Sequence, residues 1–197
     1  IMITDTEMTK EVIITAEDGS TRTLTFKIIK ESEVEEIEVK EEEKIIGIDE
    51  KYQIEAKVLP ETVKNKEKIY ESKNEEIAEV TESGEVIGKK QGETKIIVKS
   101  KENPNKTKEI RIKVVLKEIR TKKYEIKEIE DGKILIGMEV GTTIEEIKES
   151  LENDENTIKI YEEGKEIEGT EKVKTGQEIK LEIEGTIYDE AKIVLRG

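Results

Sequence analysis

Apolar residues alternate with charged residues along much of this chain, and that pattern predicts β-strands. In YQIEAKV (52–58) and KEIRIKVV (108–115), Ile, Val or Ala occupies every second position over 54–58 and 110–114, with Glu, Lys or Arg between. A strand of this period has one face to bury and one face to expose to water. The pattern is densest over residues 69–100, where Gly84, Gly88 and Gly92 separate short apolar runs. Short strands joined by glycine-bearing turns indicate an all-β sandwich.

Residues 10–30 have the pattern of a β-hairpin. Val12 and Ile14 alternate with polar neighbours, and Leu24 and Phe26 do the same after a turn over residues 16–20. Gly19 supplies the positive φ that such a turn needs. Phe26 is therefore expected to face inward. Two strands alone are marginal in water, so the hairpin is expected to pack on another sheet.

The same stretch, TKEVIITAEDGSTRTLTFKI, resembles the last two strands of the cadherin-like sandwich modules of bacterial surface proteins. This resemblance implies that residues 1–32 are the C-terminal end of a preceding β-sandwich module. The alternative is an ordinary hairpin that packs on its neighbour in the chain.

Residues 35–115 resemble the group 2 bacterial immunoglobulin-like domain. The resemblance rests on YQIEAKVLPE followed by Tyr70-x-Ser72-x-Asn74, Ile77-Ala78-x-Val80, Gly84-x-Val86 and Gly92-x-Thr94-x-Ile96. It implies an Ig-like β-sandwich over residues 33–116. The family usually has Trp where this chain has Tyr70, so Tyr70 is expected to be the large core aromatic.

The last part of the chain differs in kind. Ile144, Ile147 and Leu151 have helical spacing, and Thr142 or Thr143 with Glu145 or Glu146 forms a capping box. One helix is therefore predicted at about 142–152. Strands are expected after the Asp131-Gly132 turn and at 158–161, Val173, 179–183 and 191–195. Residues 117–197 are thus predicted to be a small α+β module, with one helix on a mostly antiparallel sheet.

This module resembles those found just upstream of dockerin repeats in secreted bacterial proteins. The residues that carry the resemblance are Gly141-Thr142-Thr143, Thr175-Gly176 and the strand from Tyr188 to Gly197. The predicted fold class is therefore mainly β, an Ig-like sandwich followed by the α+β module. The two are expected to fold independently, with a protease-sensitive junction between Val115 and Lys123.

The net charge of −14, from 35 basic and 49 acidic residues, limits the kinds of partner that the chain can bind. Such a chain repels the phosphate backbone of nucleic acids, so no nucleic-acid partner is expected. No apolar run is long enough to span a bilayer, and no membrane insertion is expected. The expected partners are other domains of the same protein.

The residue types offer little chemistry. There is no histidine and no cysteine, which removes the usual nucleophilic triads and structural zinc sites. No spacing singles out a pair of carboxylates. We therefore assign no catalytic, cofactor-binding or metal-binding residue, expect no cofactor, and predict that the chain is not an enzyme. Asn153-Asp154-Glu155-Asn156 gathers oxygen ligands, but it lacks the EF-hand pattern, and an ordinary polar turn is favoured over calcium binding.

Few aromatic residues are available for stacking on a sugar. With Phe26, Tyr52 and Tyr70 expected to be buried, Tyr124, Tyr161 and Tyr188 remain, dispersed through the last module. The resemblances imply a non-catalytic spacer or interaction fragment of a secreted or cell-surface bacterial protein, with adhesion or contact to a cell-wall or host glycan or protein. The alternative is an accessory region of a secreted hydrolase whose catalytic domain lies elsewhere.

Overall fold

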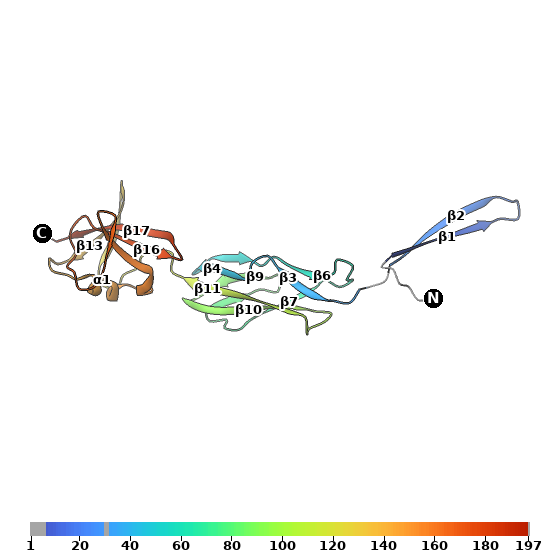
Figure 1. Cartoon of the computed structure of the whole chain (residues 1–197), viewed down its shortest axis with the longest axis horizontal. Helices are drawn as coiled ribbons and strands as arrows, with labels where there is room; N and C mark the ends of the chain where they lie inside the picture. Colours follow the sequence, from blue (N-terminus) through green and yellow to red (C-terminus); the bar gives the residue numbers. More distant parts are fainter. Residues whose placement is uncertain (1–6, 30–31, 197) are drawn as a thin grey trace. The chain divides into compact units, whose positions relative to one another are not determined.

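The computed structural model describes residues 7–29 and 32–196 and is mainly β, as the alternation predicts (Figure 1). The chain forms two compact units. The first contains the chain up to Lys44 together with Lys51–Ile87 and Glu93–Ile112. The second contains Ile45–Glu50, Gly88–Gly92 and the chain from Lys113 onward.

The predicted hairpin is present as β1 (Glu7–Thr15) and β2 (Thr21–Ile29), paired antiparallel with Val12 opposite Leu24. Its turn is closed by Asp18, whose Oδ1 accepts from both N and Oγ of Ser20 (2.9 and 2.6 Å). Val12, Ile14, Leu24 and Phe26 share one face of the ribbon, as the alternation predicts.

That face of the hairpin is not buried. Val12, Leu24 and Phe26 are 45%, 44% and 50% exposed. The expectation that Phe26 is buried is therefore wrong, although Phe26 does lie on the face of the ribbon that the alternation predicts. A two-stranded ribbon is a single layer, and periodicity cannot say whether a second layer covers it.

The sandwich strands form three short sheets. The largest has the order β4-β11-β10-β7, made of Glu43–Gly47, Thr107–Val115, Gly92–Ser100 and Lys68–Ser72. β3 (Glu36–Val39) pairs antiparallel with β6 (Ala56–Leu59). The third sheet has the order β5-β9-β8, made of Lys51–Gln53, Glu85–Gly88 and Ala78–Val80. Alternate residues of these strands are fully buried, among them Val86, Ile96, Val98, Ile110 and Ile112.

The motif residues of the sandwich have structural roles. Ser72 Oγ donates to the Ala78 carbonyl (2.6 Å) and so ties β7 to β8. Asn74 Oδ1 accepts from Glu76 N (3.1 Å) and closes the turn between them. Gly84 has φ +83°, and a Cβ there would lie 2.6 Å from Cζ of Tyr70. Glycine is therefore required at position 84 both for its backbone angle and for space.

A six-stranded sheet with the order β12-β13-β17-β16-β14-β15 forms the centre of the second unit. Its strands are Glu125–Ile129, Gly132–Met138, Thr186–Leu195, Glu178–Ile183, Ile158–Glu162 and Lys165–Ile167. β13 and β17 run parallel, and the other neighbouring pairs run antiparallel. Val173, predicted to lie in a strand, is buried outside any strand, next to the isolated bridge between Thr143 and Lys172.

The predicted helix is α1 (Ile144–Ser150), which buries Ile144 and Ile147 in the core of the second unit. Thr143 is its N-cap. Thr143 Oγ1 accepts from Glu146 N (3.2 Å) and Glu146 Oε2 accepts from Thr143 N (2.8 Å), which confirms the capping box. A short 3-10 helix, η1 (Glu155–Thr157), follows.

Candidate functional site

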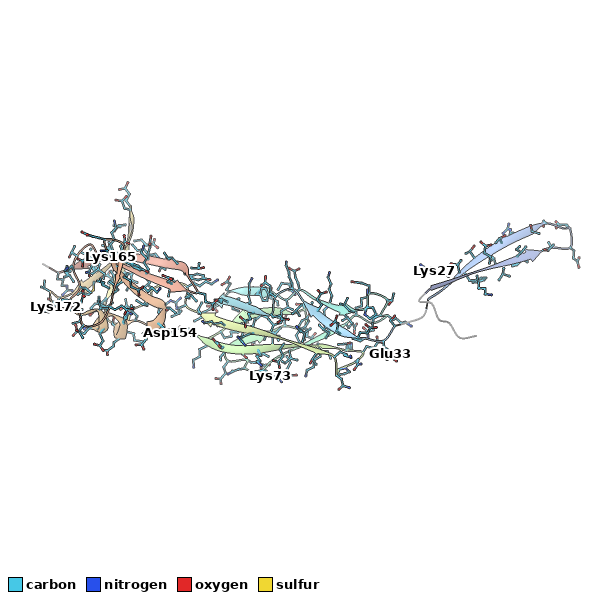
Figure 2. The ribbon with its side chains drawn as sticks, in the orientation of Figure 1. Lys27, Glu33, Lys73, Asp154, Lys165 and Lys172 are labelled. Carbon is cyan, nitrogen blue, oxygen red and sulfur yellow. The ribbon has the colours of Figure 1, made fainter. Side chains whose placement is uncertain are left out.

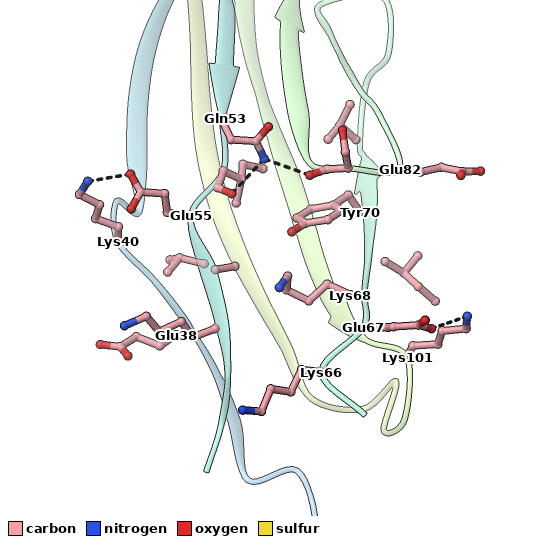
Figure 3. Close-up of a pocket in the computed structure, with 17 residues that line it drawn as sticks. Glu38, Lys40, Gln53, Glu55, Lys66, Glu67, Lys68, Tyr70, Glu82 and Lys101 are labelled. Atoms are coloured by element: carbon pink, nitrogen blue, oxygen red, sulfur yellow. Dashed lines mark hydrogen bonds and ion pairs between the residues drawn. The ribbon is translucent and has the colours of Figure 1, made fainter. Parts of the chain in front are cut away.

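A groove of about 1130 Å³ opens in the first unit, between β6 and β7 (Figure 3). It exists because β9 is too short to cover β6. The β5–β9 ladder runs from Lys51↔Ile87 to Gln53↔Glu85 and closes with Ile54 N donating to the Gly84 carbonyl (2.9 Å). The chain then turns at residues 81–84, so β6 has no neighbour on this side.

Each wall of the groove is the edge of a sheet. On β6, Lys40 N donates to the Glu55 carbonyl (3.1 Å), so Lys40 and Glu55 form a hydrogen-bonded pair at the end of the β3–β6 ladder. Hydrogen-bonded and non-hydrogen-bonded pairs alternate along an antiparallel ladder, so the next residue, Ala56, directs its N–H and C=O groups away from β3. On β7, Lys73 N donates to the Lys95 carbonyl and Lys101 N donates to the Glu67 carbonyl (2.9 Å each), so Lys73 and Glu67 belong to hydrogen-bonded pairs with β10. Lys68 and Tyr70 therefore direct their N–H and C=O groups away from β10.

Tyr70 forms the aromatic part of the groove. It is half-buried, and Figure 3 shows its hydroxyl pointing into the opening. A tyrosine phenol is protonated at neutral pH, and burial raises the pKa of Tyr70 further, so its hydroxyl can donate a hydrogen bond. Gln53 holds the rim above it, where Nε2 donates to the Ser83 and Ile54 carbonyls (3.0 and 3.3 Å).

Most charged groups near the groove are paired. Lys40 bonds Glu55 (2.7 Å), Lys101 bonds Glu67 (2.6 Å), and Lys66 bonds Glu61 (2.8 Å) outside the lining. The hydrogen bond to Glu55 raises the pKa of Lys40, and the bond from Lys66 lowers the pKa of Glu61. The lining contains five lysines and four glutamates: Lys40, Lys57, Lys66, Lys68, Lys101, Glu38, Glu55, Glu67 and Glu82.

Lys68 differs from the other four lysines of the lining, which are all exposed. It is half-buried, and Figure 3 shows its ammonium pointing into the groove on the same side as the Tyr70 hydroxyl. Within residues 7–29 and 32–196, Lys68 Nζ makes no hydrogen bond or ion pair. The groove thus combines an unpaired cation, a phenol and two strand edges.

The other tyrosines do not form a platform. Tyr52, Tyr124, Tyr161 and Tyr188 are all half-buried, and each has a lysine ammonium over its ring, from Lys44, Lys123, Lys180 and Lys117 respectively, at 5.0–5.3 Å. Tyr161 also donates its hydroxyl to Glu182 Oε2 (3.2 Å). A ring face under an ammonium is not free to stack on a sugar.

The Asn153–Asn156 cluster is a structural turn. Asn153 is buried, its Oδ1 accepting from Arg120 N and its Nδ2 donating to the Glu118 carbonyl (2.9 Å each). Asp154 caps η1 by accepting from Asn156 N (2.9 Å). Asn153 Oδ1 and Asp154 Oδ1, two of the oxygens considered for calcium, are therefore engaged with the chain itself.

In the part of the chain that the structure describes, no group of three or more Asp, Glu, His or Cys residues is arranged to hold a metal ion. No helix there is long and apolar enough to cross a membrane.

The groove was not predicted from the sequence. A signal for it exists in strand length, because the alternation over 52–58 is much longer than the short apolar run at Val86 and Ile87 that pairs with it. An unmatched length in one of two paired strands leaves an open edge.

Residues 33–110 match the model of the bacterial Ig-like domain, group 2. This confirms the resemblance for that segment. The resemblances of the hairpin to cadherin-like modules and of the last module to those upstream of dockerin repeats stay predictions. No curated protein matches the chain.

Among solved structures, the chain aligns with parts of the S-layer protein SbsC. Domains 4 and 5 align at 18% identity, with 47% of this chain and 58% of that one covered and a TM-score of 0.36. Domains 1–6 align at 15% identity over 98% of this chain and 33% of that one, with a TM-score of 0.38. The chain spans less than two thirds of the length of these proteins, and at these scores the alignments carry no functional conclusion.

Proposed function

We propose that this chain is a non-catalytic spacer and interaction segment of a secreted or cell-surface bacterial protein with several domains. The match of residues 33–110 to a bacterial Ig-like model supports the class of module. The observation that carries the proposal is that the motif residues of the sandwich make structural contacts within the fold. Ser72, Asn74 and Gly84 are engaged in turns and strand contacts, so the residues that define the module serve its fold.

The outer faces of the strands suit a hydrated spacer. Lys and Glu side chains form ion pairs between neighbouring strands, as in Lys95–Glu109 (2.6 Å), Lys51–Glu85 (2.8 Å) and Lys99–Glu71. Exposed pairs of this kind add little stability, but they keep the sheet faces polar. Lys73 and Lys165, both labelled in Figure 2, are exposed.

The domain boundaries fit the same proposal. Residues 1–32 are the end of a preceding β-sandwich, residues 33–116 the Ig-like sandwich and residues 117–197 the α+β module. The exposed apolar face of β1 and β2 supports the first boundary, because such a face is stable only when another layer covers it. The partners are then neighbouring domains of the same protein, and contact with a glycan or protein outside it is secondary.

The location can be tested on intact cells of the source bacterium. An antibody raised against residues 33–116 is expected to label unpermeabilised cells or to detect the protein in the medium. Labelling only after permeabilisation, with no protein in the medium, would overturn the proposal. A hydrolase accessory region predicts the same labelling, and hydrolytic activity of the full-length protein that survives deletion of residues 1–197 would identify that alternative.

A further inference from the structure

The groove between β6 and β7 has a chemistry that a spacer does not need. Its walls are two sheet edges with backbone groups at Ala56, Lys68 and Tyr70 directed away from their own neighbours. Unpaired strand edges are templates for another strand. The opening also lies where a longer β9 would have continued the β5–β9 ladder, so an added strand there extends an existing sheet.

The charge of the groove indicates the sign of its occupant. The whole chain has 49 acidic and 35 basic residues, whereas the groove lining has five lysines and four glutamates. In a chain with carboxylates in excess, the half-buried Lys68 has no ion pair among the described residues. A partly desolvated ammonium beside a phenol donor is an arrangement that accepts a carboxylate.

We propose that this groove binds an extended, acidic peptide segment of a partner protein, which adds as a strand along the open edge of β6. A carboxylate of the peptide bonds Lys68 Nζ and the Tyr70 hydroxyl. The proposal concerns a partner and does not depend on where the protein is located.

A peptide fits this groove better than an acidic sugar does. The strand edges offer backbone donors and acceptors in the spacing of a β-ladder, which a sugar cannot match. The Tyr70 ring is also crowded by Gly84, where a Cβ would meet three ring atoms at 2.6–3.0 Å. Little of that face remains for stacking on a sugar.

The test uses a labelled seven-residue peptide, acetyl-Val-Glu-Val-Glu-Val-Glu-Val-amide, and fluorescence anisotropy with the full chain. Saturable binding is expected below about 1 mM peptide. Lys68→Glu is expected to weaken it at least about tenfold, and Tyr70→Phe by a smaller factor, because a charge-assisted bond is worth more than a neutral one. Lys90→Glu, the same charge reversal at an exposed loop position outside the groove, is expected to leave the affinity unchanged.

Two altered peptides test the mode of binding without changing the protein. Replacing each Glu by Gln is expected to weaken binding about as much as Lys68→Glu does. Replacing the Val at position 3 of the peptide by Pro removes an N–H and is expected to weaken binding strongly. Absence of saturable binding, equal loss in Lys68→Glu and Lys90→Glu, or undiminished binding of the proline peptide would each overturn the proposal. If Lys68→Glu does not fold, as judged by circular dichroism, Lys68→Gln and the peptide comparisons give the same decision.

Discussion

Gly84 is constrained both by its backbone conformation and by its packing against Tyr70. Its φ of +83° disfavours any side chain, and the Tyr70 ring occupies the space of a Cβ. Gly84→Ala therefore adds overpacking to backbone strain and is expected to destabilise the sandwich by about 3 kcal/mol. Urea unfolding followed by circular dichroism measures this loss.

The control for that change is Gly169→Ala. Gly169 has nearly the same backbone angle, φ +80°, but nothing lies within 4 Å of its added Cβ. Only the backbone cost is expected there, roughly 1–2 kcal/mol. Equal losses in the two variants would contradict the packing role given to Tyr70.

Glu182 makes the stability of the second module depend on pH in the acidic range. The hydrogen bond from Lys159 Nζ (3.1 Å), with a further one from the Tyr161 hydroxyl (3.2 Å), lowers the pKa of the Glu182 carboxyl below its unfolded value near 4.5. The stability from this lowered pKa is present above about pH 4.5 and is lost as the pH falls through the folded-state pKa.

Glu182→Gln is therefore expected to be less stable than the parent at pH 7, with the difference shrinking as the pH falls from about 5 towards 2. Urea unfolding at several pH values measures the difference. Glu168→Gln, at an exposed position of the same module, serves as the control. A Glu182→Gln difference that stays constant with pH would show that the carboxylate's charge is not involved.

At the scale of the elements, alternation and capping predicted most of what the structure contains. The alternation at Val12 and Leu24 predicted the hairpin, and the alternation at Ile110 and Ile112 predicted a core strand. The capping box of Thr143 and Glu146 predicted the start of α1. These signals are local, because a strand period or a capping box is complete within a few residues.

The groove and the exposed hairpin face were not predicted, because each depends on what lies beside an element. Ala56 alternates as a half-buried strand residue whether or not a neighbour pairs with its other edge. Phe26 likewise has the pattern of a core residue. Only the length of the neighbouring strand, or the presence of a second layer, decides the outcome.

The hairpin is expected to be dispensable for the sandwich. Residues 9–27 are exposed throughout, so they bury little apolar area. Deletion of residues 1–30 is expected to leave the cooperative unfolding of residues 33–116 unchanged to within about 0.5 kcal/mol. Loss of that transition in the shortened chain would show that the hairpin belongs to the sandwich.

At the scale of the whole molecule, the units and the predicted modules divide the chain differently in detail. The sequence placed a boundary between residues 116 and 117, whereas Ile45–Glu50 and Gly88–Gly92 group with the second unit. Val115, Leu116 and Ile119 are buried, and Val115 and Ile119 pack in the core of the second unit. Independent folding of residues 33–116 and 117–197 stays a prediction.

The tyrosines predict weak contact with sugars. Four of the five have a lysine over the ring, and Tyr70 lies in the groove beside Gly84. Calorimetric titration with soluble oligosaccharides is expected to show binding no tighter than millimolar, about −4 kcal/mol. Micromolar affinity for any of them would require a platform that these side chains do not form.

The central claim is that the sandwich acts as a spacer, and replacing it in the full-length protein tests that claim most directly. An epitope tag is placed at the end of the protein farther from the cell, and antibody binding to intact cells is measured by flow cytometry. Deletion of residues 33–116 is expected to reduce labelling, and an unrelated Ig-like sandwich of the same length is expected to restore it. A folded replacement, displayed in equal amount, that fails to restore labelling would contradict the claim.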